Sequence, residues 1–519
     1  MSENRSQSLA GASDKSRVMK NTVMLYFRLI LNLLVSLYTV RAILAVLGAE
    51  DYGIYNVVGG VITTFSFLSS NLAGATQRFF SVQLAQDNKE CLRSVFAMSF
   101  TISLGLSLVL LVIGEFFGTW MITTQLTIPA ERMTSALTVY QATIISFVLS
   151  IINSTYMACI IAHENMNVYA YVSILESVLK LAVVYMLKVI PYDNLIVYGI
   201  LQCVVSFWVT FAYRQYCKRH YEEARARLLW DVNLFRSMFS YMGWNILGTL
   251  SNTLRTSGMS IVLNLFFTPL VNAAYGVSNQ VNSAVTSFYT NYTTAYRPQV
   301  VKTYNSNRHA ECMQLLFQST KISYFLMLFM GLPVILQAPF ILSIWLGEVP
   351  PHTVALTRLI LMVALVESIS QGLITLMSAQ GRLKEYQLVV SGITLMTLPI
   401  TWLVLALGGP PESAIVVMFG ISIASLIARI VMLRWLARLP VKRYFLEVLW
   451  PIVRVTMLAV LIPAYLNSKM SQGFLGFFVV GFSCVICVSA TMWGAGLSTQ
   501  ERKEIARILK KRFRRSTVA

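Results

Sequence analysis

Fourteen mostly apolar stretches, each long enough to cross a lipid bilayer as a helix, constrain the fold of this 519-residue chain more than any other feature. Hydrophobic residues make up 56% of the chain and charged residues only 12%, about half of the share usual in globular proteins. A soluble protein with so little charge could not cover its surface. The composition excludes a disordered chain and a secreted disulfide scaffold, and it predicts an all-α polytopic membrane protein.

The limits of the predicted spans follow from the apolar runs. One run, 312–346, is long enough to be broken near Pro333 or Pro339. The fourteen spans are 20–47, 54–82, 93–120, 134–161, 167–189, 194–215, 237–266, 270–297, 312–346, 353–379, 386–407, 413–435, 444–466 and 473–496.

The distribution of Lys and Arg tests the span count, because loops on the cytoplasmic side carry an excess of positive charge. With the N-terminus placed in the cytoplasm, 29 of the 41 basic residues fall on that side. Nine lie within spans, and only Arg132, Lys188 and Lys469 fall on the other side. A missed span would have disturbed this alternation, so we expect fourteen spans with both termini cytoplasmic.

The two halves of the chain show a weak repeat at an offset of about 220 residues, in which Tyr52–Asn56 resembles Tyr275–Asn279. Six spans per half give both halves the same sense in the membrane, which predicts two lobes related by a pseudo-two-fold axis along the membrane normal, with the substrate path between them. The expected parts are a cytoplasmic tail (1–19), an N-lobe (20–217), an amphipathic linker (218–236), a C-lobe (237–440), two additional C-terminal spans (441–496) and a basic tail (497–519).

The linker and the basic tail each combine basic residues with apolar positions. In the tail, Ser498 and Glu501 have the spacing of a capping box, which predicts the start of a helix. Both segments are expected to form amphipathic helices on the inner leaflet, where anionic lipids attract basic side chains.

Ionisable residues within spans are costly in lipid and normally face protein or water. Glu176 and Lys180 are four residues apart and are expected to pair on one helix face. Glu176 and Glu367, two acidic residues in mid-span, are the candidates for ion or proton coupling. For a further group near the span ends we expect long side chains that extend toward lipid headgroups: Arg41, Lys321, Arg358 and Arg429.

The first, second, seventh and eighth spans are unusually polar and contain no Asp or Glu. Ser, Thr and Asn can hold helices together, but packing alone does not explain arginines in these spans. We expect these helices to line a hydrated cationic cavity. Guanidinium groups match phosphate oxygens, and amides and hydroxyls suit a sugar, so an anionic sugar-bearing substrate fits. The amides that we expect to bind it are Asn252, Asn279 and Asn282.

The seven cysteines are an odd number and are scattered along the chain. Cys484 and Cys487 form a CxxC, but they lie within an apolar stretch without polar neighbours. A redox or zinc CxxC needs polar surroundings and partner ligands. We therefore expect no metal site and no cofactor.

The segment Leu47–Tyr55, preceded by Arg41 and followed by a polar second span that ends in Gln77-Arg78, resembles the polysaccharide flippases of the MOP exporter superfamily, in particular flippases of O-antigen and capsule repeat units, which are related to the lipid II flippase. The resemblance implies two six-helix bundles that alternate around a cavity and an isoprenyl pyrophosphate-linked oligosaccharide as substrate. It also implies substrate-binding arginines, carried over here to Arg28, Arg78, Arg255 and Arg297. Unlike many lipid II flippases, this chain has no carboxylate in its first span.

The resemblance further implies a place in lipopolysaccharide or other polysaccharide biosynthesis in the bacterial inner membrane. The expected partners are membrane lipids, a polysaccharide polymerase and other envelope-assembly proteins. A cation-coupled multidrug exporter of the same superfamily is the main alternative, although such exporters usually need buried carboxylates. An enzyme is not expected, because the short loops offer no paired acids and the four histidines stand singly; no nucleic acid is expected either.

Overall fold

The computed structural model describes residues 2–502 in two compact units, 1–273 and 274–519, except for the gaps named below. Every regular element in the described part is a helix, in agreement with the predicted fold class. The backbone is not described at 1, 86–88, 164, 226–227, 306–307, 381–382, 472, 499–500 and 503–519. The side chains are further not described at 2–30, 33, 78, 81–82, 85, 166, 240–242, 244–245, 294–295, 297–299, 301–302, 305, 378–379 and 383–384.

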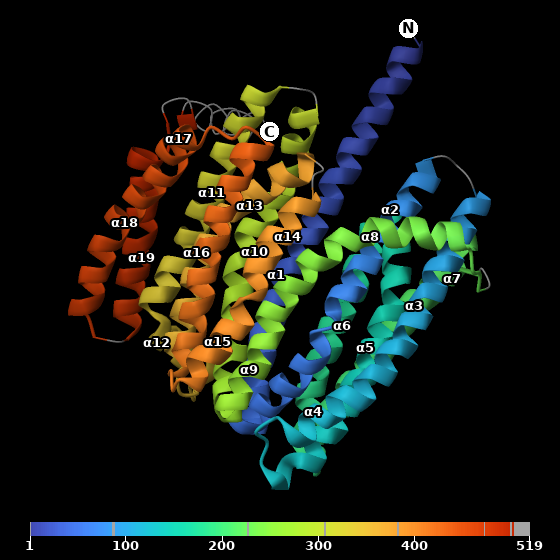
Figure 1. Cartoon of the computed structure of the whole chain (residues 1–519), viewed down its shortest axis with the longest axis horizontal. Helices are drawn as coiled ribbons and strands as arrows, with labels where there is room; N and C mark the ends of the chain where they lie inside the picture. Colours follow the sequence, from blue (N-terminus) through green and yellow to red (C-terminus); the bar gives the residue numbers. More distant parts are fainter. Residues whose placement is uncertain are drawn as a thin grey trace. The chain divides into compact units, whose positions relative to one another are not determined.

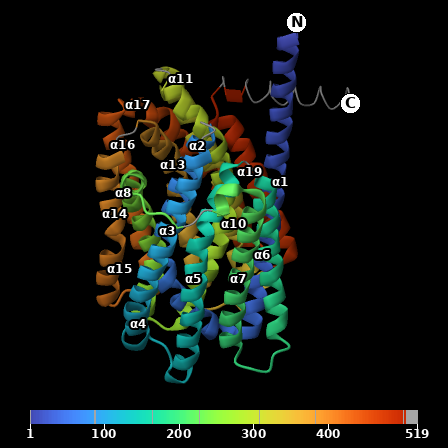
Figure 2. The same cartoon turned by 90° about the vertical axis from the view of Figure 1, so that its right-hand side faces the viewer.

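The first unit contains the predicted spans one to seven. Its helices are α1 (Ser2–Thr63), α2 (Ser66–Ala85), α3 (Lys89–Ile113), α4 (Thr119–Thr124), α5 (Met133–Ala162), α6 (Met166–Leu187), α7 (Asn194–His220), α8 (Val232–Thr253) and α9 (Met259–Phe266). α5 packs against α2, α3 and α7, and α6 packs against α1 and α7 (Figures 1 and 2). The predicted domain limits, which assign α8 and α9 to the C-lobe, stay predictions.

Two glycines set the path of the chain between the first two spans. At Gly48 the backbone adopts φ 79°, a left-handed conformation that glycine adopts without strain, and the helical path breaks there. Gly53 then packs directly on the backbone of Pro269. A Cβ atom at Gly53 would lie 1.9 Å from the carbonyl oxygen of Pro269, so the close approach requires a residue without a side chain.

A charge cluster around Arg132 joins three connections of the first unit. Its guanidinium lies 3.0 Å from Asp51 and 3.0 Å from Asp193, and the hydroxyl of Ser135 donates to Asp193 at 2.6 Å. Asp193 also caps α7 by accepting from the backbone N–H of Leu195. Burial raises the pKa of Asp193, but these hydrogen bonds and Arg132 outweigh it, so that the pKa lies below its usual value.

The second unit contains most of α10 and all later helices. They are α10 (Pro269–Asn305), α11 (His309–Leu336), α12 (Ala338–Leu346), α13 (Thr353–Gln380), α14 (Leu383–Leu395), α15 (Thr397–Ala406), α16 (Pro411–Leu436), α17 (Val441–Tyr444), α18 (Trp450–Lys469) and α19 (Phe474–Thr491). The last two lie side by side and pack on α11 (Figure 1). Their shared core includes Phe325, Tyr444, Val455, Val480 and Val488.

The expected break in the ninth span is confirmed between α11 and α12, at Gln337. Pro339 stands in the first turn of α12, where its missing N–H costs no helical hydrogen bond. Arg358 of α13 donates to the carbonyl of Ile335 at 2.9 Å, and it also bonds Leu336. The arginine thus pairs carbonyls that the break leaves without a helical partner.

Three basic side chains differ from their predicted extension toward lipid headgroups. Arg358 bonds the broken helix, and Arg429 donates to Tyr386 and Ser370. Lys321 is only 4% exposed and pairs with Glu501 at 2.8 Å. The prediction was wrong for these residues because each has a protein partner distant in sequence, which distance from a span end does not reveal.

The capping box at the start of the basic tail is confirmed. The backbone N–H of Ser498 donates to Glu501 at 2.7 Å, and the N–H of Glu501 donates to the Ser498 hydroxyl at 3.3 Å. The rest of the predicted amphipathic helix, from residue 503 onward, lies outside the described residues.

The linker does not form the expected amphipathic helix. α7 continues to His220, a single 3-10 turn spans Glu222–Arg225, and 228–231 have no helical conformation. Asp231 ends the linker as the N-cap of α8 and accepts from the N–H groups of Asn233 and Leu234. These tight caps divide the linker into pieces too short for a surface helix.

Ten helical segments in the described part of the chain are long and apolar enough to span a membrane. They coincide with the predicted spans three to six and nine to fourteen. The first two spans contribute the segments Leu34–Thr63 and Ser66–Gln77, which meet at a bend of 48°. The seventh and eighth spans correspond to α8–α9 and α10, so the helices outside the ten are the four predicted to be polar. The chain is a multi-pass membrane protein.

Replacing Gly53 with alanine is expected to destabilise the first unit by about 1–3 kcal/mol, because the added Cβ overlaps the Pro269 carbonyl and forces the backbones apart. Thermal unfolding of the purified protein in detergent measures the effect. Gly59→Ala on the same helix is the matched control, since a Cβ there meets no atom within 4 Å. Equal melting temperatures for the two variants would contradict the packing assigned to Gly53.

Asp193→Asn is expected to lower the melting temperature at pH 7, and its difference from the wild type is expected to shrink as the pH falls below about 4. A carboxyl whose folded pKa is depressed stabilises the fold above its unfolded pKa of about 3.9, and this contribution disappears as the pH falls through the folded pKa. Melting curves of both proteins from pH 7 to pH 3 measure the difference. Glu131→Gln, at an exposed neighbouring carboxylate, is the control. A difference that stays constant with pH would contradict this role of the charge.

Candidate functional site

The second span bends where hydroxyl side chains compete for backbone carbonyls. Between α1 and α2, the hydroxyl of Thr64 donates to the carbonyl of Gly60 at 2.8 Å, and that of Thr63 donates to the same carbonyl at 3.3 Å. Such back-bonding by threonine bends helices. The bend leaves Thr63 exposed at the break.

The seventh span is interrupted by a π-helical turn, Leu254–Gly258, between α8 and α9. Arg255 lies in this turn and donates to Asn252 at 3.2 Å, while Thr256 donates to the carbonyls of Asn252 and Thr253. Arg255 is partly buried and Asn252 is exposed. π-Turns inside helices are frequent at functional sites because they redirect side chains locally.

Two side-chain hydrogen bonds join the second and seventh spans within the first unit. The amide of Asn71 donates to Thr249 at 2.5 Å, and Thr63 donates to Ser257 at 3.2 Å. Asn71 is buried, so at least this amide serves helix packing. The polar residues of these spans therefore have two roles. Asn71 holds two helices together, whereas Arg255 and the exposed Asn252 can make other contacts.

The structure brings together Arg255 and Asn252 among the predicted substrate-binding residues. Asn279 and Asn282 lie on α10 in the second unit; Asn279 donates to the carbonyl of Tyr275, and both asparagines are partly buried. Arg28, Arg78 and Arg297 have backbones in α1, α2 and α10, but their side chains lie outside the described residues.

Glu176 and Lys180 form the predicted pair, at 2.6 Å, in a cleft of about 370 Å³ within the first unit. Asn32 of α1 donates to Ser173 at 2.9 Å and accepts from Ser177 at 2.8 Å, which ties α1 to α6 beside the pair. The cleft is also lined by the rings of Tyr55 and Tyr198, whose centroids are 4.7 Å apart. The cleft therefore combines an acid, a base and neutral hydrogen-bonding groups.

Glu367, the second coupling candidate, lies on α13 in the second unit. Ser422 of α16 donates to it at 3.4 Å. One turn along α13, Ser370 accepts from Arg429. The two candidate acids thus belong to different units and have different neighbours, a basic one at Glu176 and a hydroxyl at Glu367.

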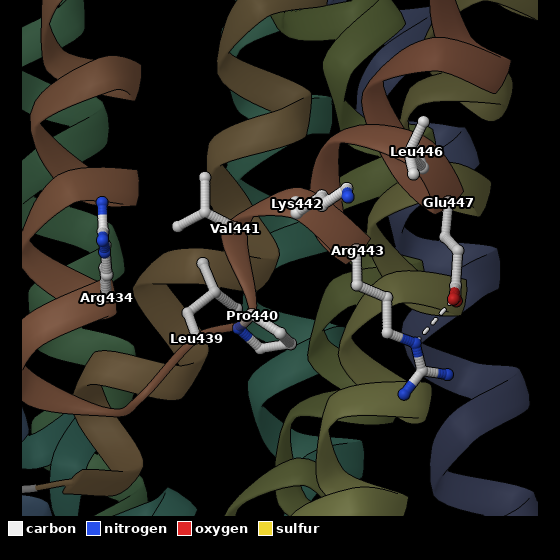
Figure 3. Close-up of a pocket in the computed structure, with 8 residues that line it drawn as sticks. All are labelled: Arg434, Leu439, Pro440, Val441, Lys442, Arg443, Leu446 and Glu447. Atoms are coloured by element: carbon white, nitrogen blue, oxygen red, sulfur yellow. Dashed lines mark hydrogen bonds and ion pairs between the residues drawn. The ribbon is translucent and has the colours of Figure 1, made fainter.

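A basic cleft of about 740 Å³ lies between the end of α16 and the start of the thirteenth span (Figure 3). Arg434, Lys442 and Arg443 contribute positive charge, and Arg443 pairs with Glu447. Leu439, Pro440, Val441 and Leu446 form its apolar lining. Basic pockets between spans can bind anionic headgroups. The contact of this chain with membrane lipids stays a prediction.

The sequence does not predict how the cleft around Glu176 and Lys180 is assembled. The spacing of Glu176 and Lys180 predicts their pair, but Asn32 and Tyr55 approach it from more than a hundred residues earlier in the chain. The polar Asn32 in the first span was the one available signal. Nor was the π-turn around Arg255 expected, because the run 237–266 reads as a continuous span.

Comparison with solved structures places the fold among known transporters. The lipid II flippase MurJ, in an inward closed conformation, matches with a TM-score of 0.63 at 11% identity, over 92% of this chain and 99% of that one. A multidrug resistance MATE family transporter of the MOP superfamily, in an inward-facing conformation, matches with a TM-score of 0.61 at 13% identity, over 80% and 98%.

The MATE multidrug transporter DinF-BH matches with a TM-score of 0.59 at 13% identity, over 80% of this chain and 95% of that one. No family model matches the sequence, and no curated protein matches it either. The chain thus shares the fold of MurJ and of MATE transporters, which confirms the predicted fold class.

Proposed function

We propose that this chain is an alternating-access flippase that moves an isoprenyl pyrophosphate-linked oligosaccharide from the cytoplasmic to the outer leaflet of the bacterial inner membrane. The observation that carries the proposal is Arg255, a permanently charged group beside Asn252 in a π-turn of a span without acidic residues. Charged groups within spans mark substrate pathways, because their burial in lipid is costly. A pyrophosphate is an anionic group that such a pathway suits.

The chemistry around Arg255 suits both parts of such a substrate. The planar guanidinium offers several donors to phosphate oxygens and keeps its charge at any physiological pH. Asn252, exposed beside it, offers an amide donor and acceptor of the kind that binds sugar hydroxyls. Arg28, Arg78 and Arg297, with Asn279 and Asn282, are proposed as further substrate contacts on the other polar spans.

The fold is equally compatible with a cation-coupled multidrug exporter, since MATE transporters share it. The absence of Asp and Glu from spans one, two, seven and eight favours the flippase. Arginines without carboxylates repel organic cations. According to the flippase proposal, the chain acts in the synthesis of O-antigen lipopolysaccharide or another envelope polysaccharide. Both termini lie in the cytoplasm, and the chain associates with a polymerase and other assembly proteins.

Arg255→Ala is expected to slow translocation of lipid-linked oligosaccharide in proteoliposomes by roughly tenfold to a hundredfold, the cost of losing a hydrogen bond between charged groups. Arg255→Lys should retain part of the rate, because lysine keeps the charge without the planar fork. Arg308→Ala is the control, since that exposed arginine pairs with Glu311 on the neighbouring turn.

Mass spectrometry of lipid-linked sugars in a deletion strain tests the substrate class independently. Accumulation of the glycolipid in the inner leaflet supports the flippase. The multidrug-exporter function would be supported instead if the deletion strain became drug-sensitive without such accumulation and the purified protein bound organic cations. Unchanged translocation in Arg255→Ala would refute the assignment of the site to the seventh span.

We further propose that Glu176 couples transport to a proton gradient, because it is an acid in mid-span that faces a cleft and a basic partner. Glu176→Gln should abolish the stimulation of translocation by a pH gradient and leave the gradient-free rate. The pair is more than a third exposed and contributes less than about 1 kcal/mol, so the variant should fold.

The control for this experiment is Glu115→Gln, which removes an acid near the end of the third span that accepts from Gln141. Glu367→Gln tests the second coupling candidate in the same assay. Gradient stimulation that persists in Glu176→Gln but is lost in Glu367→Gln would move the coupling role to the second unit.

A further inference from the structure

Three side chains with metal-binding atoms converge where the end of α5 meets the segment that follows α7. Cys159 and His163 stand four residues apart on α5 and its C-cap, and Glu223 belongs to the 3-10 turn after α7. Nε2 of His163 lies 2.6 Å from Oε1 of Glu223, and Sγ of Cys159 lies 3.9 Å from the same oxygen. All three donor atoms lie within 4.8 Å of one another.

The cluster is enclosed by protein. Cys159 is fully buried, Glu223 is 7% exposed, and His163 is partly buried. Tyr221 stacks on the His163 ring at a centroid distance of 4.1 Å, and its hydroxyl accepts from Asn165 at 2.5 Å. The stacked ring, itself held by Asn165, fixes the plane of the imidazole beside Glu223.

An ion pair between His163 and Glu223 does not explain why Cys159 lies beside them. His163 and Glu223 can satisfy each other, but the pair leaves the Cys159 thiol with a contact of 3.9 Å, too long to contribute much. A second buried thiol, Cys217, interacts with Cys159 and donates to the carbonyl of Tyr156 at 3.6 Å. Two neighbouring buried thiols thus lie at this junction, and one of them is close to the Glu223 carboxylate.

We propose that Cys159, His163 and Glu223 bind a zinc ion. Thiolate, imidazole and carboxylate are the ligands of zinc, whereas magnesium and calcium select oxygen ligands. Zinc bonds of about 2.0 Å to N and O and about 2.3 Å to S separate tetrahedral ligands by roughly 3.3–3.5 Å. The observed 2.6 and 3.9 Å bracket this separation, and all three donor atoms lie within 4.8 Å of one another, so modest side-chain movements would seat the ion.

The ion would join two elements that are far apart in sequence. Two of its ligands come from α5 and its C-cap, and the third comes from the linker that precedes α8. The neighbouring pair Arg93–Glu222 at 2.9 Å holds the same 3-10 turn to α3 from outside. Zinc would therefore fix the start of the linker against the end of α5, at the side that the charge distribution assigns to the cytoplasm.

Metal content of the full-length protein in detergent tests the site. The protein is stripped with a chelator, loaded with Zn²⁺ and desalted. We expect close to one zinc per chain, and a loss of affinity of at least about a hundredfold in Cys159→Ser, His163→Ala and Glu223→Gln, more than the loss of an outer partner causes. Cys312→Ser, at a buried thiol in the second unit, should bind zinc like the wild type.

Cobalt substitution keeps the test decisive if a variant fails to fold. Co²⁺ added to the wild-type protein should give a thiolate-to-cobalt charge-transfer band and the visible bands of tetrahedral coordination. A cobalt spectrum without the thiolate band, or equal zinc content in the wild type and the three ligand variants, would overturn the proposal. Neither measurement involves transport, so failure here leaves the proposed flippase function untouched.

Discussion

Everything in this fold depends on keeping backbone N–H and C=O groups paired where lipid provides no partner. Helices achieve this alone, and at three of the interruptions described above a polar side chain also bonds a nearby backbone carbonyl. Arg358 serves the carbonyls at the α11–α12 break, and Thr63 and Thr64 bond a carbonyl at the bend of the second span. The π-turn around Arg255 is bordered by the hydroxyl of Thr256 in the same way. Some of the polar residues in these spans are thus present because a helix that bends in a membrane needs side-chain hydrogen bonds to its backbone.

Features that depend on local sequence were predicted well. The limits of the apolar spans, a break near Pro333 or Pro339, the Ser498–Glu501 capping box and the Glu176–Lys180 pair all follow from composition or from spacing within a turn. The linker was predicted wrongly, because its amphipathic pattern ignores that α7 continues to His220 and that Asp231 starts a new helix. Periodicity detects a helical face, but it does not show where a preceding helix ends.

Features that depend on contacts between residues distant in the chain could not be predicted from the sequence. Asn71 reads as a cavity residue, yet it donates to Thr249 and is buried between two helices. Lys321 reads as a headgroup contact, yet its partner lies 180 residues away. The sequence does not predict the Cys159–His163–Glu223 cluster for the same reason: two members lie one turn apart, but the third is 60 residues away. For the proposed substrate site, the sequence and the resemblance select Arg255 and Asn252, and the structure adds the π-turn from which Arg255 reaches Asn252 at the end of α8.

The buried Lys321–Glu501 pair has a consequence for where this protein can be shortened. Glu501 belongs to the basic tail, and its carboxylate is the partner of the Lys321 ammonium group inside the second unit. A chain that ended before Glu501 would leave that ammonium group buried without its partner, at a cost of about 3–5 kcal/mol. The functional end of the folded unit is therefore set by electrostatics, several residues beyond the last membrane-spanning helix. Trimming or fusing at the C-terminus should preserve residues through Arg502, which bonds the carbonyls of Gly494 and Leu497.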